Sequence, residues 1–114
     1  MKTTDQTAAT DQVAATDATV ATDETRDFAV FIAECLSEKQ ADEIVVLDVG
    51  DLVGYCDYFV IASGRNARQL GAMVTHVERR VDDTTERRAI GREGIREGNW
   101  ALLDYGDIVV HLFR

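Results

Sequence analysis

The turn Ser63-Gly64-Arg65-Asn66 is the first stretch of this sequence where ligand chemistry is conceivable. It follows an apolar run and opens an expected helix, and helix N-termini present free N–H groups that can bind phosphate. The turn lacks the glycine pattern of a dinucleotide-binding loop and the G-K-[ST] ending of a P-loop. We therefore favour a structural turn. The alternative is a nucleotide-binding or nucleotidyltransferase-like enzyme that uses Ser63-Gly64 and the helix N-terminus.

Carboxylate spacing tests that alternative. Nucleotidyltransferases hold Mg²⁺ with two carboxylates two positions apart on a strand, because alternate side chains share a face. No two acidic residues in this chain are separated by a single residue. Asp48 and Asp51, like Asp104 and Asp107, are three apart and would face opposite sides of a strand unless a turn intervened. The sequence therefore argues against a metal-dependent transferase and predicts neither metal nor cofactor.

His76 and His111 are the remaining acid–base candidates. A nucleophilic site needs a serine or cysteine close to a histidine, and none of these residues sits in a recognisable nucleophile motif. Cys35 and Cys56 lack C-x-x-C spacing and histidine companions, so we expect buried thiols in a reducing cytosol. Both histidines are predicted to be structural, and the chain is predicted not to be an enzyme.

Basic side chains concentrate in one segment, where they are interleaved with acidic ones: Arg87, Arg88, Arg92 and Arg96, with Glu86, Glu93 and Glu97. We favour a solvated loop with local ion pairs, and the more specific alternative is a contact with the backbone of an RNA. The formal net charge of −9 argues against bare nucleic acid as the main ligand. It favours a basic partner, or else adaptation to a salty cytoplasm.

The elements that position these residues begin after a low-complexity segment. Residues 1–25 are mostly Thr, Ala and Asp, which bury too little surface to offset the entropy of ordering, so a disordered acidic tail is predicted. Residues 26–114 can bury one core and are predicted to form a single α/β domain. No stretch reaches the roughly 20 apolar residues of a membrane span, and a signal peptide is not evident, so we expect a cytoplasmic protein without membrane contact.

Two amphipathic helices are predicted from apolar side chains at helical spacing. The apolar stripe of the first consists of Phe28, Phe31, Ile32, Cys35 and Leu36. The second opens at Asn66, a good N-cap, with Gln69 completing a variant of the capping box. Its buried stripe consists of Leu70, Met73, Val74, Val77 and Val81.

Strands are predicted where β-branched residues run together. Residues 44–49 and 58–62 are continuous apolar runs, which are typical of strands covered on both faces. Ala89-Ile90 is a candidate for a short edge strand. With the hairpin described next, the order of elements predicts a mixed four- to five-stranded sheet with flanking helices.

A β-hairpin is predicted at the end of the chain, from strands at 100–103 and 108–113 around the Gly-containing turn 104–107. In the second strand Ile108, Val110 and Leu112 should face one side of the sheet, and Val109, His111 and Phe113 the other. Tyr105 at the tip is expected to be displayed, because its own strands cannot easily bury it. With Trp100 at the open end, the hairpin offers aromatic side chains to a partner.

These stretches resemble the ribosomal silencing factor family (RsfS, Iojap-related) across residues 28–113. The resemblance rests on motifs that occur in order and at family spacing: I-V-V-L-D-V at 44–49, D-Y-F-V-I-A-S-G at 57–64, R-Q at 68–69, G-R-E-G at 91–94 and W-A-L-L-D-Y-G-D-I-V-V-H-L-F at 100–113. Family members usually continue past the last strand with an aromatic-bearing helix, whereas this sequence stops at Arg114, which we expect to leave part of the sheet uncovered.

The resemblance implies a nucleotidyltransferase-like fold without the catalytic carboxylates. It also implies binding to the conserved protein L-fourteen of the large ribosomal subunit, which blocks joining of the small subunit and represses translation. The alternative kept for the basic segment is then a contact with nearby ribosomal RNA. By motif match the partner-contacting residues are Trp100, Leu103, Asp104 and Tyr105. A module that homodimerises through its aromatic residues is a further alternative.

Overall fold

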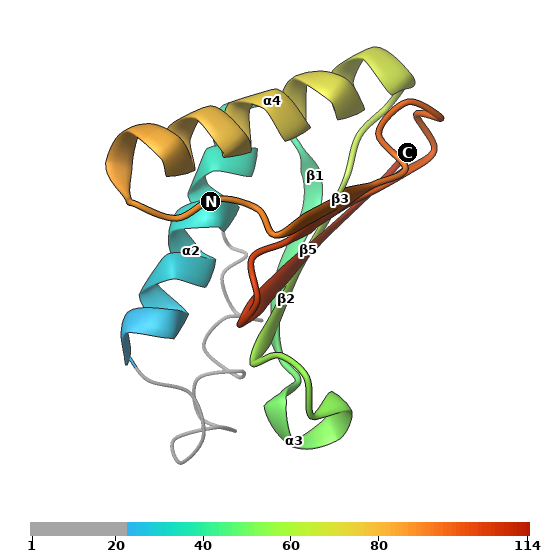
Figure 1. The fold of residues 1–114 in the computed structure, drawn as a ribbon. Coiled ribbons are helices and arrows are strands. Elements are labelled where there is room, and N and C mark those ends of the chain that lie inside the picture. Colours follow the sequence, from blue (N-terminus) through green and yellow to red (C-terminus); the bar gives the residue numbers. More distant parts are fainter. Residues whose placement is uncertain (1–22) are drawn as a thin grey trace.

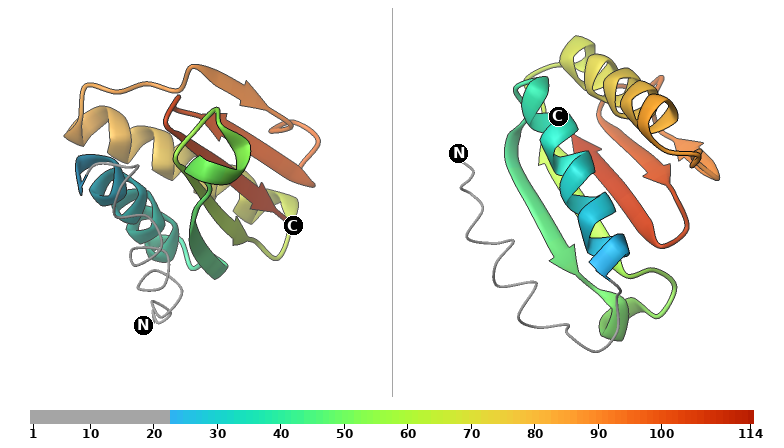
Figure 2. Two further views of the ribbon diagram at one scale, coloured as in Figure 1. Left: turned by 90° about the horizontal axis from the view of Figure 1, so that it is seen from below. Right: turned by 90° about the vertical axis from the view of Figure 1, so that its left-hand side faces the viewer.

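The computed structural model describes residues 23–114, which form one mixed sheet with two long helices on the same face (Figures 1 and 2). The elements in chain order are α2 (Asp23–Glu38), β1 (Asp42–Asp48), α3 (Gly50–Val53), β2 (Tyr58–Ser63), α4 (Ala67–Thr84), β3 (Gly91–Glu93), β4 (Trp100–Asp104) and β5 (Ile108–Phe113). The predicted tail lies outside the described residues except at its end, and the domain boundary at residue 26 stays a prediction.

The sheet has five strands in the order β1-β2-β5-β4-β3. β2 and β5 are parallel, and the other neighbouring pairs are antiparallel. The predicted α/β class with a mixed sheet is therefore confirmed, including the hairpin between β4 and β5. The short edge strand is Gly91–Glu93 rather than Ala89-Ile90, because Gly91 is the first residue of this segment that pairs in register, opposite Asp104.

Helices α2 and α4 pack their predicted apolar stripes onto one face of the sheet. Every stripe residue is buried except Phe31, which is partly buried at the margin of the core. The start of α4 is capped as predicted, since the Gln69 N–H donates to Asn66 Oδ1 at 2.8 Å. Gln69 Oε1 in turn accepts the Arg65 N–H at 2.6 Å, which completes the variant capping box.

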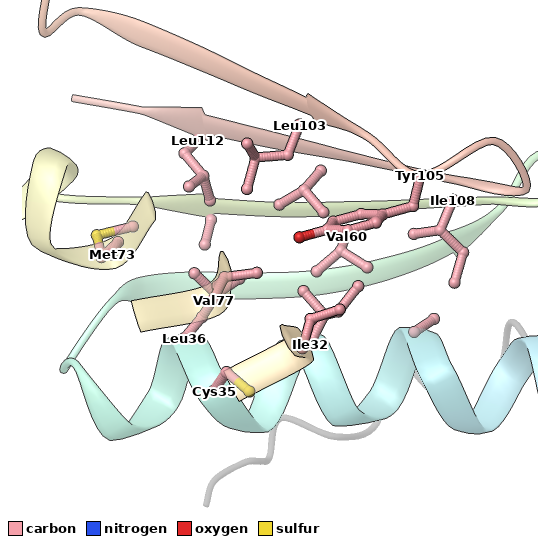
Figure 3. Packing of buried hydrophobic residues seen from close by; sticks show 14 of the residues in the cluster. Ile32, Cys35, Leu36, Val60, Met73, Val77, Leu103, Tyr105, Ile108 and Leu112 are labelled. Carbon is pink, nitrogen blue, oxygen red and sulfur yellow. The ribbon is translucent and has the colours of Figure 1, made fainter. Parts of the chain in front are cut away.

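The core lies between these helices and the sheet, and Figure 3 shows side chains from both layers meeting there. From β5, Ile108, Val110 and Leu112 are each fully buried, as the alternation in the sequence predicts. None of the helices in the described part of the chain is long and apolar enough to cross a membrane.

The opposite face of the sheet carries no long helix, so the prediction that the first two strands are covered on both faces is wrong. β1 is an edge strand, and Leu47 on it is 36% exposed. In β2 buried and partly buried residues alternate. Apolar side chains on this second face are covered only at one end, where Val49 and Cys56, beside α3, pack on Val109.

Candidate functional site

The face of the sheet opposite α2 and α4 gathers a continuous set of apolar and aromatic side chains that no long helix covers. Strand register places three rows across it: Leu47, Phe59, Val109 and Asp104; Val45, Ile61, His111 and Leu102; and Ser63, Phe113 and Trp100. We call these residues the open face. Most are apolar or aromatic, which is unusual for a surface that solvent reaches, and such patches commonly bind other proteins.

Aromatic rings occupy the centre of the open face around His111. Its imidazole lies 4.7 Å from the Phe59 ring, 6.3 Å from Trp100 and 6.5 Å from Phe113, measured between centroids. Burial lowers the pKa of His111, which favours the neutral ring. The open face therefore presents an uncharged aromatic centre, with Trp100 37% and Phe113 42% exposed.

The four residues predicted to contact a partner divide between the two faces of the sheet. Trp100 and Asp104 belong to the open face, whereas Leu103 is fully buried beneath the helices and Tyr105 is only 3% exposed. The expectation that the turn displays Tyr105 is therefore wrong. Figure 3 shows the side chains of Leu103 and Tyr105 directed into the core.

Tyr105 is buried because α2 supplies the cover that its own hairpin cannot. Its ring packs edge-on against Phe28, with centroids 5.5 Å apart, and burial raises the pKa of Tyr105 to about 12. Arg87 closes this contact by donating to Tyr105 O at 2.8 Å and placing its guanidinium 4.3 Å from the centroid of the Phe28 ring. Arg87 also forms an ion pair with Asp107, so the turn is tied to the body.

Asp104 shapes the turn and still reaches the margin of the open face. Its Oδ1 accepts the Gly106 N–H at 2.8 Å, and the Tyr105 N–H donates to Ile108 O at the same distance. Gly106 has φ +92°, a conformation that favours glycine. The side chain of Asp104 is held in place by the turn geometry, which fixes where its charge is offered.

The candidate phosphate turn uses its backbone donors within the chain. The Gly64 N–H donates to Phe113 O at 2.7 Å, and the Arg65 N–H is taken by Gln69. A Cβ at Gly64 would meet Met73 Sδ at 3.1 Å, so close packing accounts for this glycine. These contacts support the structural turn that we favoured from the sequence.

The other residues that could bind a metal or act in catalysis are also engaged in packing or ion pairs. Nowhere in residues 23–114 do three or more His, Cys, Asp or Glu side chains gather as metal ligands. His76 Nε2 lies 2.7 Å from Glu38 Oε1. Cys35 and Cys56 are buried free thiols, and burial raises the pKa of each, which disfavours the nucleophilic thiolate.

Three of the four arginines in the basic segment pair with acidic residues elsewhere in the chain. Arg92 Nε lies 2.6 Å from Glu78 Oε2, Arg88 Nε lies 3.9 Å from Asp82 Oδ1, and Arg87 pairs with Asp107. The predicted ion pairs thus join the loop to α4 and to the hairpin, rather than forming within the segment. The RNA alternative stays a prediction.

Comparison with known proteins gives a consistent result. The family model "Ribosomal silencing factor during starvation" (RsfS) matches residues 22–114. The chain is similar to the ribosomal silencing factor RsfS of Zymomonas mobilis, with 39% identity over 83 residues that cover 73% of this chain and 62% of that protein. It is also similar to the mouse protein "Mitochondrial assembly of ribosomal large subunit protein 1", with 32% identity over 71% of this chain and 36% of the relative.

The fold agrees with solved structures. A crystal structure of a protein from Chromobacterium violaceum superposes with a TM-score of 0.71 at 28% sequence identity, covering 82% of this chain and 75% of that one. The chain thus spans less than two thirds of the length of the two relatives named above and most of the length of this solved structure.

Proposed function

Because the chain belongs to the family of ribosomal silencing factors, we propose that it is a non-enzymatic translational repressor that binds the large ribosomal subunit. When it is bound there, the chain would block joining of the small subunit by steric exclusion. The observation that carries this proposal is the family match over residues 22–114. We further propose that the partner is protein L-fourteen of the large subunit, and that the open face meets it.

Physical properties of the molecule support this partner. An apolar aromatic surface supplies the desolvated anchor on which protein interfaces depend. The net charge of −9 would draw the chain toward a basic ribosomal protein and raise the association rate. Trp100 supplies the apolar anchor, since it is a large exposed ring, and Asp104 adds a negative charge at the border of the same face.

The burial of the four predicted residues suggests different roles for them. We assign direct contact to Trp100 and Asp104, whose side chains belong to the open face. Leu103 and Tyr105 lie on the other side of the same hairpin and are assigned a positioning role, because they fix β4 and its turn against the helices. Substituting either of these two would then weaken binding by disturbing the hairpin.

A subunit-joining assay tests the proposal. Purified full-length chain is added to separated ribosomal subunits, and the fraction of joined ribosomes is measured by sedimentation. We expect joining to decrease with increasing chain, and the Trp100→Ala variant to require about thirtyfold more protein for the same effect. Undiminished joining at saturating chain would refute the repressor function, and equal potency of Trp100→Ala would refute the assigned face.

The other sequence-based alternatives differ in their support. A nucleotide site at Ser63-Gly64 is disfavoured, because the backbone donors of Gly64 and Arg65 are engaged within the chain. Homodimerisation through the aromatic residues would use the same open face, and sedimentation of the chain without subunits distinguishes it. The cytoplasmic location stays a prediction.

A further inference from the structure

The short helix α3 and the residues just after it expose two large apolar side chains that the core does not use. Leu52 is 83% exposed and Tyr55 is 67% exposed. Figure 1 shows α3 at one end of the sheet, apart from α2 and α4. Solvated apolar side chains of this size, three residues apart on one projecting segment, are a feature of surfaces that bind partners.

The connection that carries α3 is anchored to the sheet. The N–H groups of Leu52 and Val53 both donate to Val49 O at 2.9 Å, and the Val49 N–H donates to Asp57 O at the same distance. Val49 and Cys56 are buried against β5. A partner that bound Leu52 and Tyr55 would therefore meet an ordered element, and the entropy lost on binding would be small.

Aromatic contacts join the tip of α3 to the open face. The ring of Tyr55 lies 6.5 Å from that of Phe59, which in turn contacts His111 at 4.7 Å. His111 stacks on Trp100 at 6.3 Å. A continuous row of rings thus leads from α3 across the sheet to Trp100, so a partner seated on the open face can extend onto α3.

The charge around α3 is negative. Residues 48–57 contain Asp48, Asp51 and Asp57 and neither lysine nor arginine. Asp107 also lies at this end of the sheet, since the Asp57 N–H donates to its backbone oxygen at 2.7 Å, but its carboxylate is paired with Arg87. An exposed aromatic ring among carboxylates attracts lysine and arginine side chains through cation–π contact and charge.

We infer that the tip of α3, which we define as Asp51 and Leu52 of the helix with Tyr55 just after it, is a second contact region of the open face and binds a lysine- or arginine-bearing segment of its protein partner. Leu52 packs on the apolar stems of that segment, and Tyr55 with Asp51 binds its cationic groups. This inference rests on the proposed function and extends the same interface beyond the hairpin.

Binding of the full chain to purified large subunits tests the contact. Leu52→Ser and Tyr55→Ser are each expected to raise the dissociation constant about tenfold. The control is Ile90→Ser, because Ile90 is 74% exposed but precedes β3 at the opposite edge of the sheet. Its dissociation constant should stay within about twofold of the parent. Thermal unfolding of all three variants should match the parent, because the side chains are solvated.

Charge reversal tests the cationic part of the inference. Asp51→Lys should raise the dissociation constant about tenfold, and Asp83→Lys, which changes the net charge equally at an exposed position on α4, about twofold. Equal effects of the two reversals would assign the loss to net charge alone and overturn the contact at α3.

The outcomes separate this inference from the proposed function. If Trp100→Ala weakens binding while the Leu52 and Tyr55 variants bind like the parent, the role of α3 is refuted and the proposed function stands. If the parent chain itself does not bind large subunits, both are refuted.

Discussion

The ring of Tyr105 meets the ring of Phe28 edge-on, with centroids 5.5 Å apart and planes inclined by 86°. Through this contact the turn of the hairpin is held by the first helix of the domain. Tyr105→Ala should lower the free energy of unfolding by about 3 kcal/mol, because it leaves a cavity beside Phe28. Tyr105→Phe keeps the ring and should change it by less than about 1 kcal/mol. Urea denaturation measures both, and equal losses would contradict a packing role.

Arg87 should matter more than its neighbour Arg88, although both belong to the same basic segment. Arg87 donates to Tyr105 O, pairs with Asp107 and covers the Phe28 ring. Arg87→Ala should therefore cost about 2 kcal/mol of unfolding free energy. The side chain of Arg88 is 83% exposed and 3.9 Å from its partner, so Arg88→Ala should cost less than about 0.5 kcal/mol. Similar losses for the two variants would show that the contacts of Arg87 add little.

The fate of Tyr105 shows what local sequence can and cannot predict. The turn itself was predicted correctly from its residues, since Gly106 provides the positive φ that the reversal requires. The expected exposure of Tyr105 is wrong, because the residue that covers it, Phe28, is far away in the chain and belongs to α2. A residue in a turn can be buried by any element that packs nearby, and that information is absent from the local pattern.

The candidate face was predictable only in part. Alternation along β5 correctly placed His111 and Phe113 on the side opposite the core. The apolar runs of β1 and β2 gave no such signal, because a continuous run is compatible with cover on one face or on both. Phe59 lies beside His111 because β2 and β5 pair in parallel. Which strands become neighbours depends on tertiary structure.

His111 should make the stability of the domain depend on pH. Burial among aromatic rings lowers its pKa from the ordinary value of 6.5, so the folded state resists protonation more than the unfolded chain does. The contribution of His111 to the free energy of unfolding is therefore fully present above about pH 6.5. It falls as the pH is lowered through and below that value, because the unfolded chain takes up the proton first.

Urea denaturation at about pH 7.5 and about pH 5.5 measures this loss. His111→Phe should show a smaller decrease between these two conditions than the parent. His76→Gln removes the other histidine, which contacts Glu38, and should keep the decrease that His111 causes. An unchanged decrease in His111→Phe would assign the pH dependence to other groups.

Trp100 and Tyr105 should separate binding from stability. Trp100→Ala removes a side chain that is 37% exposed on the open face, so large-subunit binding should weaken by about 2 kcal/mol, with a smaller loss of folding stability than Tyr105→Ala causes. Tyr105→Ala should weaken both, because Tyr105 acts through the position of the hairpin. Co-sedimentation with large subunits and urea denaturation of the same preparations make the comparison. A Tyr105→Ala protein that stayed fully stable but lost binding would instead indicate direct contact.

Two glycine-to-alanine substitutions should have opposite effects on stability. Gly71 lies within α4, and an added Cβ would meet no heavy atom within 4 Å, so Gly71→Ala should raise the free energy of unfolding by about 0.5 to 1 kcal/mol. Gly94 has φ +74°, and its Cβ would lie 2.0 Å from the backbone oxygen of Trp100. Gly94→Ala must therefore displace the start of β4 and should lower the free energy by about 2 kcal/mol or more.

The same pair of variants reports on the open face, because Trp100 is the only tryptophan of the chain. Displacing β4 in Gly94→Ala should shift the fluorescence emission of the folded protein and weaken large-subunit binding. Gly71→Ala should leave the emission unchanged, since α4 lies on the other face of the sheet (Figure 2). A Gly94→Ala variant that instead kept the emission, the affinity and the stability of the parent would show that the loop before β4 changes its conformation without moving Trp100. The position of this ring would then be set by β5 alone.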